Sequence, residues 1–245
     1  MKQTLKALGA GLFWVLVWYL LAAAVNKPLL LPMPGAVLAR VLELAAEASF
    51  WRILLVSVFR VSLGILGGLL LGVILGCLCH VSDLVRTLAA PLLTIIKAAP
   101  VASFIILLLI WIGRDIVPGV IGALIVIPVV YSGVRSGLES VDGDILEMAA
   151  AYELSFSTRV RNIVIPSVKP YFLSSIRASV GIGWKAGIAA EVLTVPVLSI
   201  GKMIYESKLY LETTDLFAWT LCTVLLSLII EGLMTPGKKK EAGHE

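Results

Sequence analysis

The chain is poor in charged residues. Asp, Glu, Lys and Arg make up 15% of its 245 residues, whereas about 25% is usual in soluble domains. So little charge excludes an ordinary soluble enzyme, a disordered protein and a nucleic-acid-binding protein. The net charge of +4 does not change this, because the basic residues are scattered and the only run is Lys238-Lys239-Lys240. We therefore interpret the basic residues as signals of membrane topology.

Cysteine and histidine are also scarce. The three cysteines, Cys77, Cys79 and Cys222, all lie in apolar stretches. An odd number of cysteines in apolar stretches does not indicate a framework of disulfide bonds. Cys77 and Cys79 point about 200° apart on a helix, so they cannot bind one ion together with His80. The sequence therefore predicts no metal site and no cofactor. It also lacks the cluster of His, Asp or Cys that a membrane-embedded enzyme needs.

A phosphate-binding loop, Gly-x-x-x-x-Gly-Lys followed by Ser or Thr, is absent as well. The Gly-Lys pairs of the chain are Gly201-Lys202, followed by Met203, and Gly237-Lys238. The chain therefore cannot bind ATP by that route, and we expect no enzymatic activity of its own.

Apolar sequence is abundant, since 59% of the residues are hydrophobic. A membrane-spanning helix needs about 20 mostly apolar residues. The sequence thus predicts an all-α membrane protein with about six transmembrane helices, in a single domain over residues 1–245. The predicted spans are residues 8–25, 53–79, 91–112, 117–135, 171–193 and 216–234. Pro100 and Pro128 interrupt the third and fourth spans and predict kinks there.

Six spans place both termini on one side of the membrane. The loops on that side contain more Lys and Arg than those on the other, so both termini are expected to be cytoplasmic in a plasma or inner membrane. Residues 26–52 should hold a short outer helix, and residues 194–215 an outer loop or re-entrant segment. Residues 136–170 form the longest cytoplasmic loop.

Glycine recurs every four residues in the second span, at Gly64, Gly68, Gly72 and Gly76. Because four residues advance a helix by 400°, these glycines form one stripe against which another helix can pack closely. That helix could belong to this chain or to a second copy.

Charged side chains within the spans are candidates for function, since a Lys or Arg at the bilayer centre costs about 2.5–3.5 kcal/mol. Arg60 and Lys97 lie near span ends and can reach an interface, whereas Arg177 and Lys185 should face protein or water. The fifth span also carries Ser175, Ser179, Gly183 and Gly187 on one face. It either lines a water-filled path or is buried between other helices. The candidate pathway residues are Lys97, Pro100, Arg177, Ser179, Gly183, Trp184, Lys185 and Glu191.

The cytoplasmic loop predicts a short helix over residues 145–155. Asp144 would cap its start and Glu147 would complete a capping box. Leu146, Ala150 and Leu154 would then share an apolar face, which needs either a protein groove or the headgroup layer of the membrane.

The loop resembles the signature of the permease subunits of ATP-binding-cassette importers. In that family the pattern is Glu-Ala-Ala, three residues, Gly, nine residues, Ile, one residue, Leu-Pro. Here Met148, Glu153 and Ile165 replace the second residue, the Gly and the Leu, without a gap in spacing. The resemblance implies that ATPase subunits are coupled through Glu147, Met148, Ala149, Ala150, Glu153, Leu154, Ile163, Ile165 and Pro166.

The likeness is greatest to the branch that imports nitrate, taurine and sulfonates. It rests on Leu31-Pro32-Met33-Pro34, Ser57-Val58-Phe59-Arg60 with Gly64, Lys97 with Pro100 and Ala102, and the series Arg177, Trp184, Glu191. The resemblance implies two ATPase subunits, a second and identical permease copy, and an extracytoplasmic binding protein, with membrane lipid around them. The solute would be a small anion or zwitterion such as a sulfonate, taurine, nitrate or bicarbonate. An ion-gradient-driven secondary transporter, with Lys185, Glu191 and Arg177 as a relay, is the alternative.

Overall fold

The computed structural model describes residues 2–234, and every regular element within them is a helix. The all-α fold class is therefore confirmed. The run Lys238 to Lys240 lies outside the described residues. In chain order the elements are α1 (Lys2–Val25), α2 (Pro34–Ala45), α3 (Ala48–Val81), α4 (Asp83–Ala98), α5 (Val101–Ile112), α6 (Val117–Glu139), α7 (Gly143–Ala151), α8 (Phe156–Arg159), the π-helical turn η1 (Val160–Val164), α9 (Ile165–Thr194), α10 (Ile200–Leu209) and α11 (Thr213–Met234).

Three helices in the described part of the chain are long and apolar enough to cross a bilayer. They are α3, α6 and residues Thr213–Leu233 of α11, which correspond to the second, fourth and sixth predicted spans. The apolar part of α1, Gly9–Val25, is shorter, and α9 is long but less apolar. The first and fifth spans therefore remain predictions.

The third predicted span is interrupted at Pro100, as expected, but the interruption is a complete break between two helices and not a kink in one. α4 ends at Ala98, α5 begins at Val101, and the chain bends by 109° between the two helices. Pro100 has no N–H to continue the helical ladder, and it forces Ala99 before it into an extended conformation (φ −76°, ψ 142°). The pair is one broken span, which would be a fourth, or a re-entrant loop. Pro128, in contrast, lies within the uninterrupted α6.

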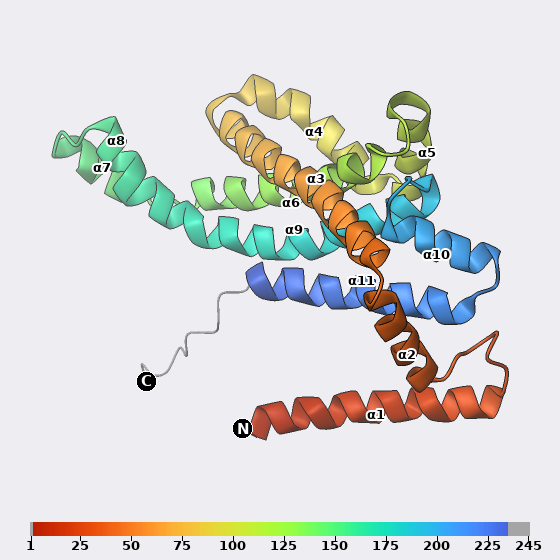
Figure 1. The fold of residues 1–245 in the computed structure, drawn as a ribbon. Coiled ribbons are helices and arrows are strands. Elements are labelled where there is room, and N and C mark those ends of the chain that lie inside the picture. Colours follow the sequence, from red (N-terminus) through yellow and green to blue (C-terminus); the bar gives the residue numbers. More distant parts are fainter. Residues whose placement is uncertain (1, 235–245) are drawn as a thin grey trace.

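Helix α6 packs along both α3 and α9, and α3 and α9 also contact each other (Figure 1). The glycine stripe of α3 forms the contact with α6. A Cβ added at Gly64 would overlap the carbonyl of Gly119, and one at Gly72 would lie 2.8 Å from the Cβ of Val130. The helix that packs on the stripe is therefore α6 of the same chain. Small residues permit this close approach.

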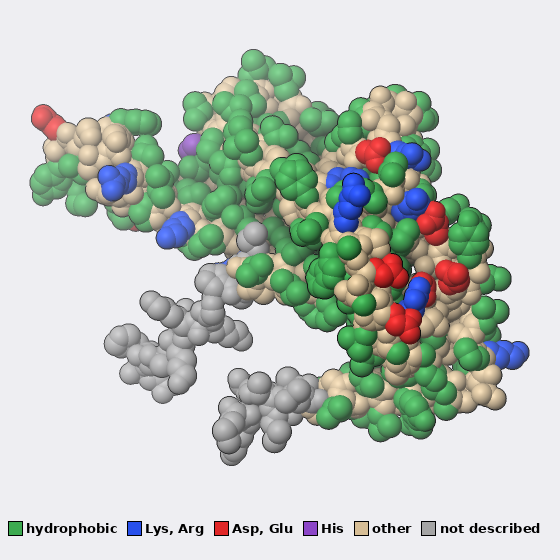
Figure 2. Space-filling model, in the orientation of Figure 1, with side chains coloured by type: hydrophobic (Ala, Val, Ile, Leu, Met, Phe, Trp, Pro, Cys, Tyr) green, Lys and Arg blue, Asp and Glu red, His purple; other side chains and the backbone are tan. Residues whose placement is uncertain are grey.

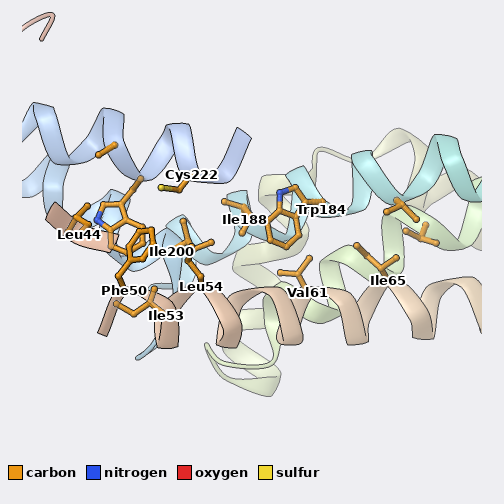
Figure 3. Close-up of a cluster of buried hydrophobic side chains, with 14 of the residues drawn as sticks. Leu44, Phe50, Ile53, Leu54, Val61, Ile65, Trp184, Ile188, Ile200 and Cys222 are labelled. Atoms are coloured by element: carbon orange, nitrogen blue, oxygen red, sulfur yellow. The ribbon is translucent and has the colours of Figure 1, made fainter. Parts of the chain in front are cut away.

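The main apolar core joins α3, α9 and α11 to the shorter helices (Figure 3). Trp184 of α9 is fully buried and lies close to Val61 of α3. Phe50 and Trp219 bring α3 and α11 together, with ring centroids 5.2 Å apart. Leu44 of α2 and Ile200 of α10 belong to the same core, which holds these short helices in place (Figure 3).

The two ends of the helices carry different segments. α2, α10 and the turn between α5 and α6 lie at one end, here called the α10 end. The starts of α1 and α9, the end of α11, and α7 and α8 lie at the other (Figure 1). Charged side chains gather over the α10 end in the view of Figure 2. Apolar side chains cover much of the surface between the two ends.

Arg40 joins α2 to α11 at the α10 end. Its Nε and Nη2 donate to the two carboxylate oxygens of Asp215, at 2.7 and 2.9 Å. These hydrogen bonds raise the pKa of the Arg40 guanidinium above its ordinary value, because they stabilise its charged form.

The short helix expected within residues 26–52 is α2. It starts at Pro34, because the first residue of a helix needs no N–H for the helical hydrogen bonds.

Candidate functional site

Residues 143–164 form a lobe that extends away from the rest of the helices. It consists of α7, α8 and η1 and is here called the distal lobe. Figure 1 shows α7 and α8 at the far end of α9, clear of the packed bundle. The lobe contains most of the importer signature, and the remaining residues, Ile165 and Pro166, begin α9.

Helix α7 begins two residues earlier than the sequence predicts. The cap is Asp142, whose Oδ1 accepts a hydrogen bond from the N–H of Asp144 at 2.9 Å. The prediction of Asp144 as the cap was therefore wrong, since Gly143 already adopts the helical conformation. Asp144 lies in the first turn, where its negative charge is favourable next to the helix N-terminus.

The end of α7 explains the glycine of the family signature. Glu153, which occupies that position, has φ of 52°, in the left-handed region that glycine adopts without a steric penalty. Its N–H donates to the carbonyl of Ala150 at 2.9 Å, and the N–H of Leu154 donates to the carbonyl of Ala149 at 3.0 Å. This pair of bonds is a Schellman motif. The turn therefore forms in this chain without glycine, but with backbone strain at Glu153.

The apolar surface of the distal lobe differs from the predicted face. Leu146 is half-buried, Ala149 is buried, and Ala150 and Leu154 are exposed. The large exposed apolar side chains include Ile145, Met148, Tyr152 and Phe156. Tyr152 and Phe156 are the most open, at 75% and 76% exposed. Sequence reasoning missed Ile145, Tyr152 and Phe156, although the spacing 145, 148, 152 is that of one helical face.

A π-helical turn connects the lobe to α9. The N–H of Ile165 donates to the carbonyl of Val160, five residues back. Pro166 follows at once and has no N–H to offer to the preceding turn. Ile163 is half-buried and Ile165 is exposed. The last part of the signature therefore marks the place where the backbone changes from the lobe to the long helix α9.

The Ser and Gly face of α9 is a packing face within this chain. Ser179 is fully buried, and its hydroxyl donates to the carbonyl of Ile176 at 3.1 Å. A Cβ added at Gly183 would lie 2.8 Å from Cγ2 of Val126 in α6. Trp184 is also fully buried. In this structure the face is packed against α3 and α6, and a role in a pathway stays a prediction.

The other face of α9 carries exposed cations. Arg177 is exposed and makes no ion pair with the described residues. Lys185 is also exposed, and its Nζ lies 3.6 Å from Oε1 of Glu231 in α11. Lys97 of α4 is exposed too, with its Nζ 3.5 Å from the hydroxyl of Ser132 in α6. The candidate pathway residues thus divide into a buried set and an exposed set.

Glu191 lies at the centre of a buried polar cluster near the end of α9. Its Oε1 accepts from Nη1 of Arg60 at 2.7 Å, and its Oε2 accepts from the hydroxyl of Ser57 at 2.9 Å and from the N–H of Gly201 at 3.2 Å. Arg60 also donates to the carbonyl of Leu198 at 3.2 Å. We call Ser57, Arg60, Glu191 and Gly201 the Glu191 cluster. Arg60 is therefore largely buried against Glu191, and its Nη2 also lies 3.9 Å from Oδ1 of the exposed Asp115.

Comparison with known proteins identifies the family of this chain. Residues 68–235 match the family described as the binding-protein-dependent transport system inner membrane component. The chain belongs to this family of transport permeases. The match includes the distal lobe, α9 and α11, and it confirms the resemblance on which the interpretation of the signature rests.

Similar proteins carry more specific names. The putative aliphatic sulfonates transport permease SsuC of Bacillus subtilis is 26% identical over 83% of this chain and 74% of its own length. The taurine transport system permease TauC of Escherichia coli is 24% identical over 94% of this chain and 86% of its own. The nitrate import permease NrtB of Leptolyngbya laminosa is 24% identical over 77% and 67%. The chain is thus similar to permeases of the nitrate, taurine and sulfonate branch of ABC importers.

The family membership has two consequences. The chain is a multi-pass membrane permease and a transport subunit. The family membership therefore argues against the alternative, an ion-gradient-driven secondary transporter.

Proposed function

We propose that this permease forms the translocation pathway of an importer for a small anionic or zwitterionic solute, such as a sulfonate, taurine, nitrate or bicarbonate. Two copies of the chain work with two ATPase subunits and an extracytoplasmic binding protein. Each copy crosses the membrane six times, with α1, α3, the α4–α5 pair, α6, α9 and α11 as the spans. The distal lobe and both termini are cytoplasmic, and the α10 end faces outward.

The distal lobe is the observation that carries this proposal. It extends beyond the bundle on the same side as the start of α1 and the end of α11 (Figure 1). Met148, Tyr152 and Phe156 expose more than half of their surface there. A capped helix with an exposed apolar face fits a groove in a partner protein. Since the chain contains no phosphate-binding loop, an ATPase is the partner that the transport reaction requires.

The charges within the spans favour an anionic solute. Arg60 is neutralised by Glu191, and Lys185 lies close to Glu231. Lys97 and Arg177 are exposed and form no ion pair within the described chain. They therefore supply the positive charge that lowers the barrier for an anion in low-dielectric surroundings.

Co-purification tests the role of the lobe. We expect Met148→Asp to weaken binding of the ATPase about 30-fold, because burying a charge in an apolar contact costs on the order of 2 kcal/mol. Ser157→Asp, which adds the same charge in the same lobe but outside α7, is the matched control. Both variants should reach the membrane in normal amounts. Retention of the ATPase by Met148→Asp at full affinity would contradict the assignment of α7.

Uptake measurements test the solute class. The complete importer, with its binding protein, is offered taurine, alkanesulfonates, nitrate, bicarbonate and a neutral pyrimidine in turn. We expect uptake of an anion or zwitterion, and a lower maximal rate in Arg177→Gln than in the wild type. Uptake of the neutral compound alone would contradict an anionic solute but would not contradict the function as an importer.

A further inference from the structure

Helix α10 lies between two strained junctions. Val195, between α9 and α10, has φ of 49°, and Leu211, between α10 and α11, has φ of 60°. A positive φ is uncommon for any residue except glycine, and for a β-branched residue such as Val195 it is a clear outlier. Such conformations persist only where the surrounding structure enforces them, and they concentrate at functional sites. Something must therefore hold α10 in its place.

The Glu191 cluster holds the start of α10. Two consecutive N–H groups at its N-terminus find buried partners, because Ile200 donates to the hydroxyl of Ser57 at 2.9 Å and Gly201 donates to Glu191. The carboxylate thus meets the positive end of the helix dipole. Its other bonds, to Ser57 and Arg60, fix it to α3. One side chain therefore ties three helices together.

Gly201 makes this contact possible. A Cβ added there would overlap the main chain and Cβ of Glu191. The start of α10 therefore lies directly on the end of α9, with no room between them. α9 runs as one helix from the π-turn at the distal lobe to Glu191. A displacement of its end must carry α10 with it or break the cluster.

We infer that Glu191 is a positioning residue of the importer, which holds α10 closed over the outer ends of α3 and α9. The inference rests on the proposed function, because it takes the α10 end as the outer side. Movement of the distal lobe reaches α10 through α9, and the outer side opens when the bonds from Glu191 to Arg60 and Gly201 separate. Relief of the backbone strain at Val195 and Leu211 then favours the displaced position of α10.

Thiol accessibility in the purified importer tests this directly. Cys77, Cys79 and Cys222 are first replaced by Ala. A single reporter is then introduced as Ser207→Cys on α10 or as Ser175→Cys on α9, two near-isosteric changes at buried positions. Reaction with a charged maleimide is timed in the parent and after adding Glu191→Ala, Glu191→Gln or Gly201→Ala. Gly67→Ala is the matched control, since an added Cβ there meets nothing.

We expect Glu191→Ala and Gly201→Ala to speed the reaction of the Ser207→Cys reporter at least about tenfold, the change that 1.4 kcal/mol in an opening equilibrium produces. The Ser175→Cys reporter should stay slow in every variant. Glu191→Gln should lie in between, because its amide oxygen still accepts from Gly201. ATP hydrolysis without the binding protein should rise in the same order, which a loss of folding would not cause.

Two results would overturn the inference. One is an unreactive Ser207→Cys reporter in both Glu191→Ala and Gly201→Ala. The other is an equal rise at Ser175→Cys, which would make Glu191 a general stabilising residue. Failure of the ATPase to bind the lobe would be a different result. It would contradict the proposed function and leave the accessibility of α10 as an independent measurement.

Discussion

The two ends of α9 differ in how their buried polar groups are satisfied. At the α10 end, the carboxylate of Glu191 accepts three hydrogen bonds and pairs with Arg60 inside the protein. Both ends expose large apolar side chains and contain strained residues, Glu153 at the distal end and Val195 and Leu211 at the α10 end. At the distal end, however, the Nε of Arg159 is buried without a partner among the described residues. A buried donor without an acceptor lowers stability. The comparison indicates that the Glu191 cluster is completed within this chain, whereas the distal lobe keeps a buried donor that no described residue satisfies.

The largest effect is expected at the Glu191 cluster. Arg60→Ala should lower the free energy of unfolding by about 3–5 kcal/mol, because it leaves the Glu191 carboxylate buried and uncompensated. Arg52→Ala is the control, since Arg52 makes no ion pair in the described structure. Thermal unfolding of the purified permease measures both. The double variant Arg60→Leu with Glu191→Leu should be more stable than Arg60→Ala, and equal stability would argue against a charge effect.

A smaller loss is expected in the middle of the chain, where α3 and α6 pack. Gly64→Val should lower stability by about 1–3 kcal/mol, because the new side chain must separate the two helices at Gly119. Gly67→Val, on the same helix, meets open space and should have little effect. If both variants unfold at the same temperature, the packing of the stripe on α6 is wrong.

The smallest effect is expected at the distal end, and it is an increase in stability. Glu153→Gly should stabilise the end of α7 by about 1 kcal/mol, because glycine adopts the left-handed conformation without a Cβ penalty. Hydrogen exchange of the Glu153 and Leu154 amides should slow accordingly. Glu153→Ala retains the Cβ and should give no such gain. Faster exchange in Glu153→Gly would show that the Glu153 side chain itself supports the turn.

The sequence predicts much of this fold because long apolar stretches and glycine spacing are local signals. The second, fourth and sixth spans and the packing role of the stripe follow from them. The break at Pro100 was expected only as a kink, since the angle between α4 and α5 depends on their contacts with α6 and α9. The start of α7 was misplaced because Asp142 and Asp144 are both good caps, and the local pattern does not choose between them.

The sequence likewise identifies some of the functional residues and not others. The signature identifies the distal lobe, but not Tyr152 and Phe156, which lie outside the matching positions. Sequence also suggests that Glu191 and Arg60 matter, but not that they meet, because 131 residues separate them. Such long-range pairs depend on the packing of whole helices. The same holds for the Ser and Gly face of α9, whose burial depends on α3 and α6.

Photocrosslinking from the distal lobe tests the central claim most directly. A photoreactive amino acid at position 148 is compared with one at position 182, an exposed site on α9. In the assembled importer, we expect position 148 to form an adduct with the ATPase subunit and position 182 to form none. An adduct with lipid alone at position 148 would place α7 in the headgroup layer and contradict its role as the ATPase contact.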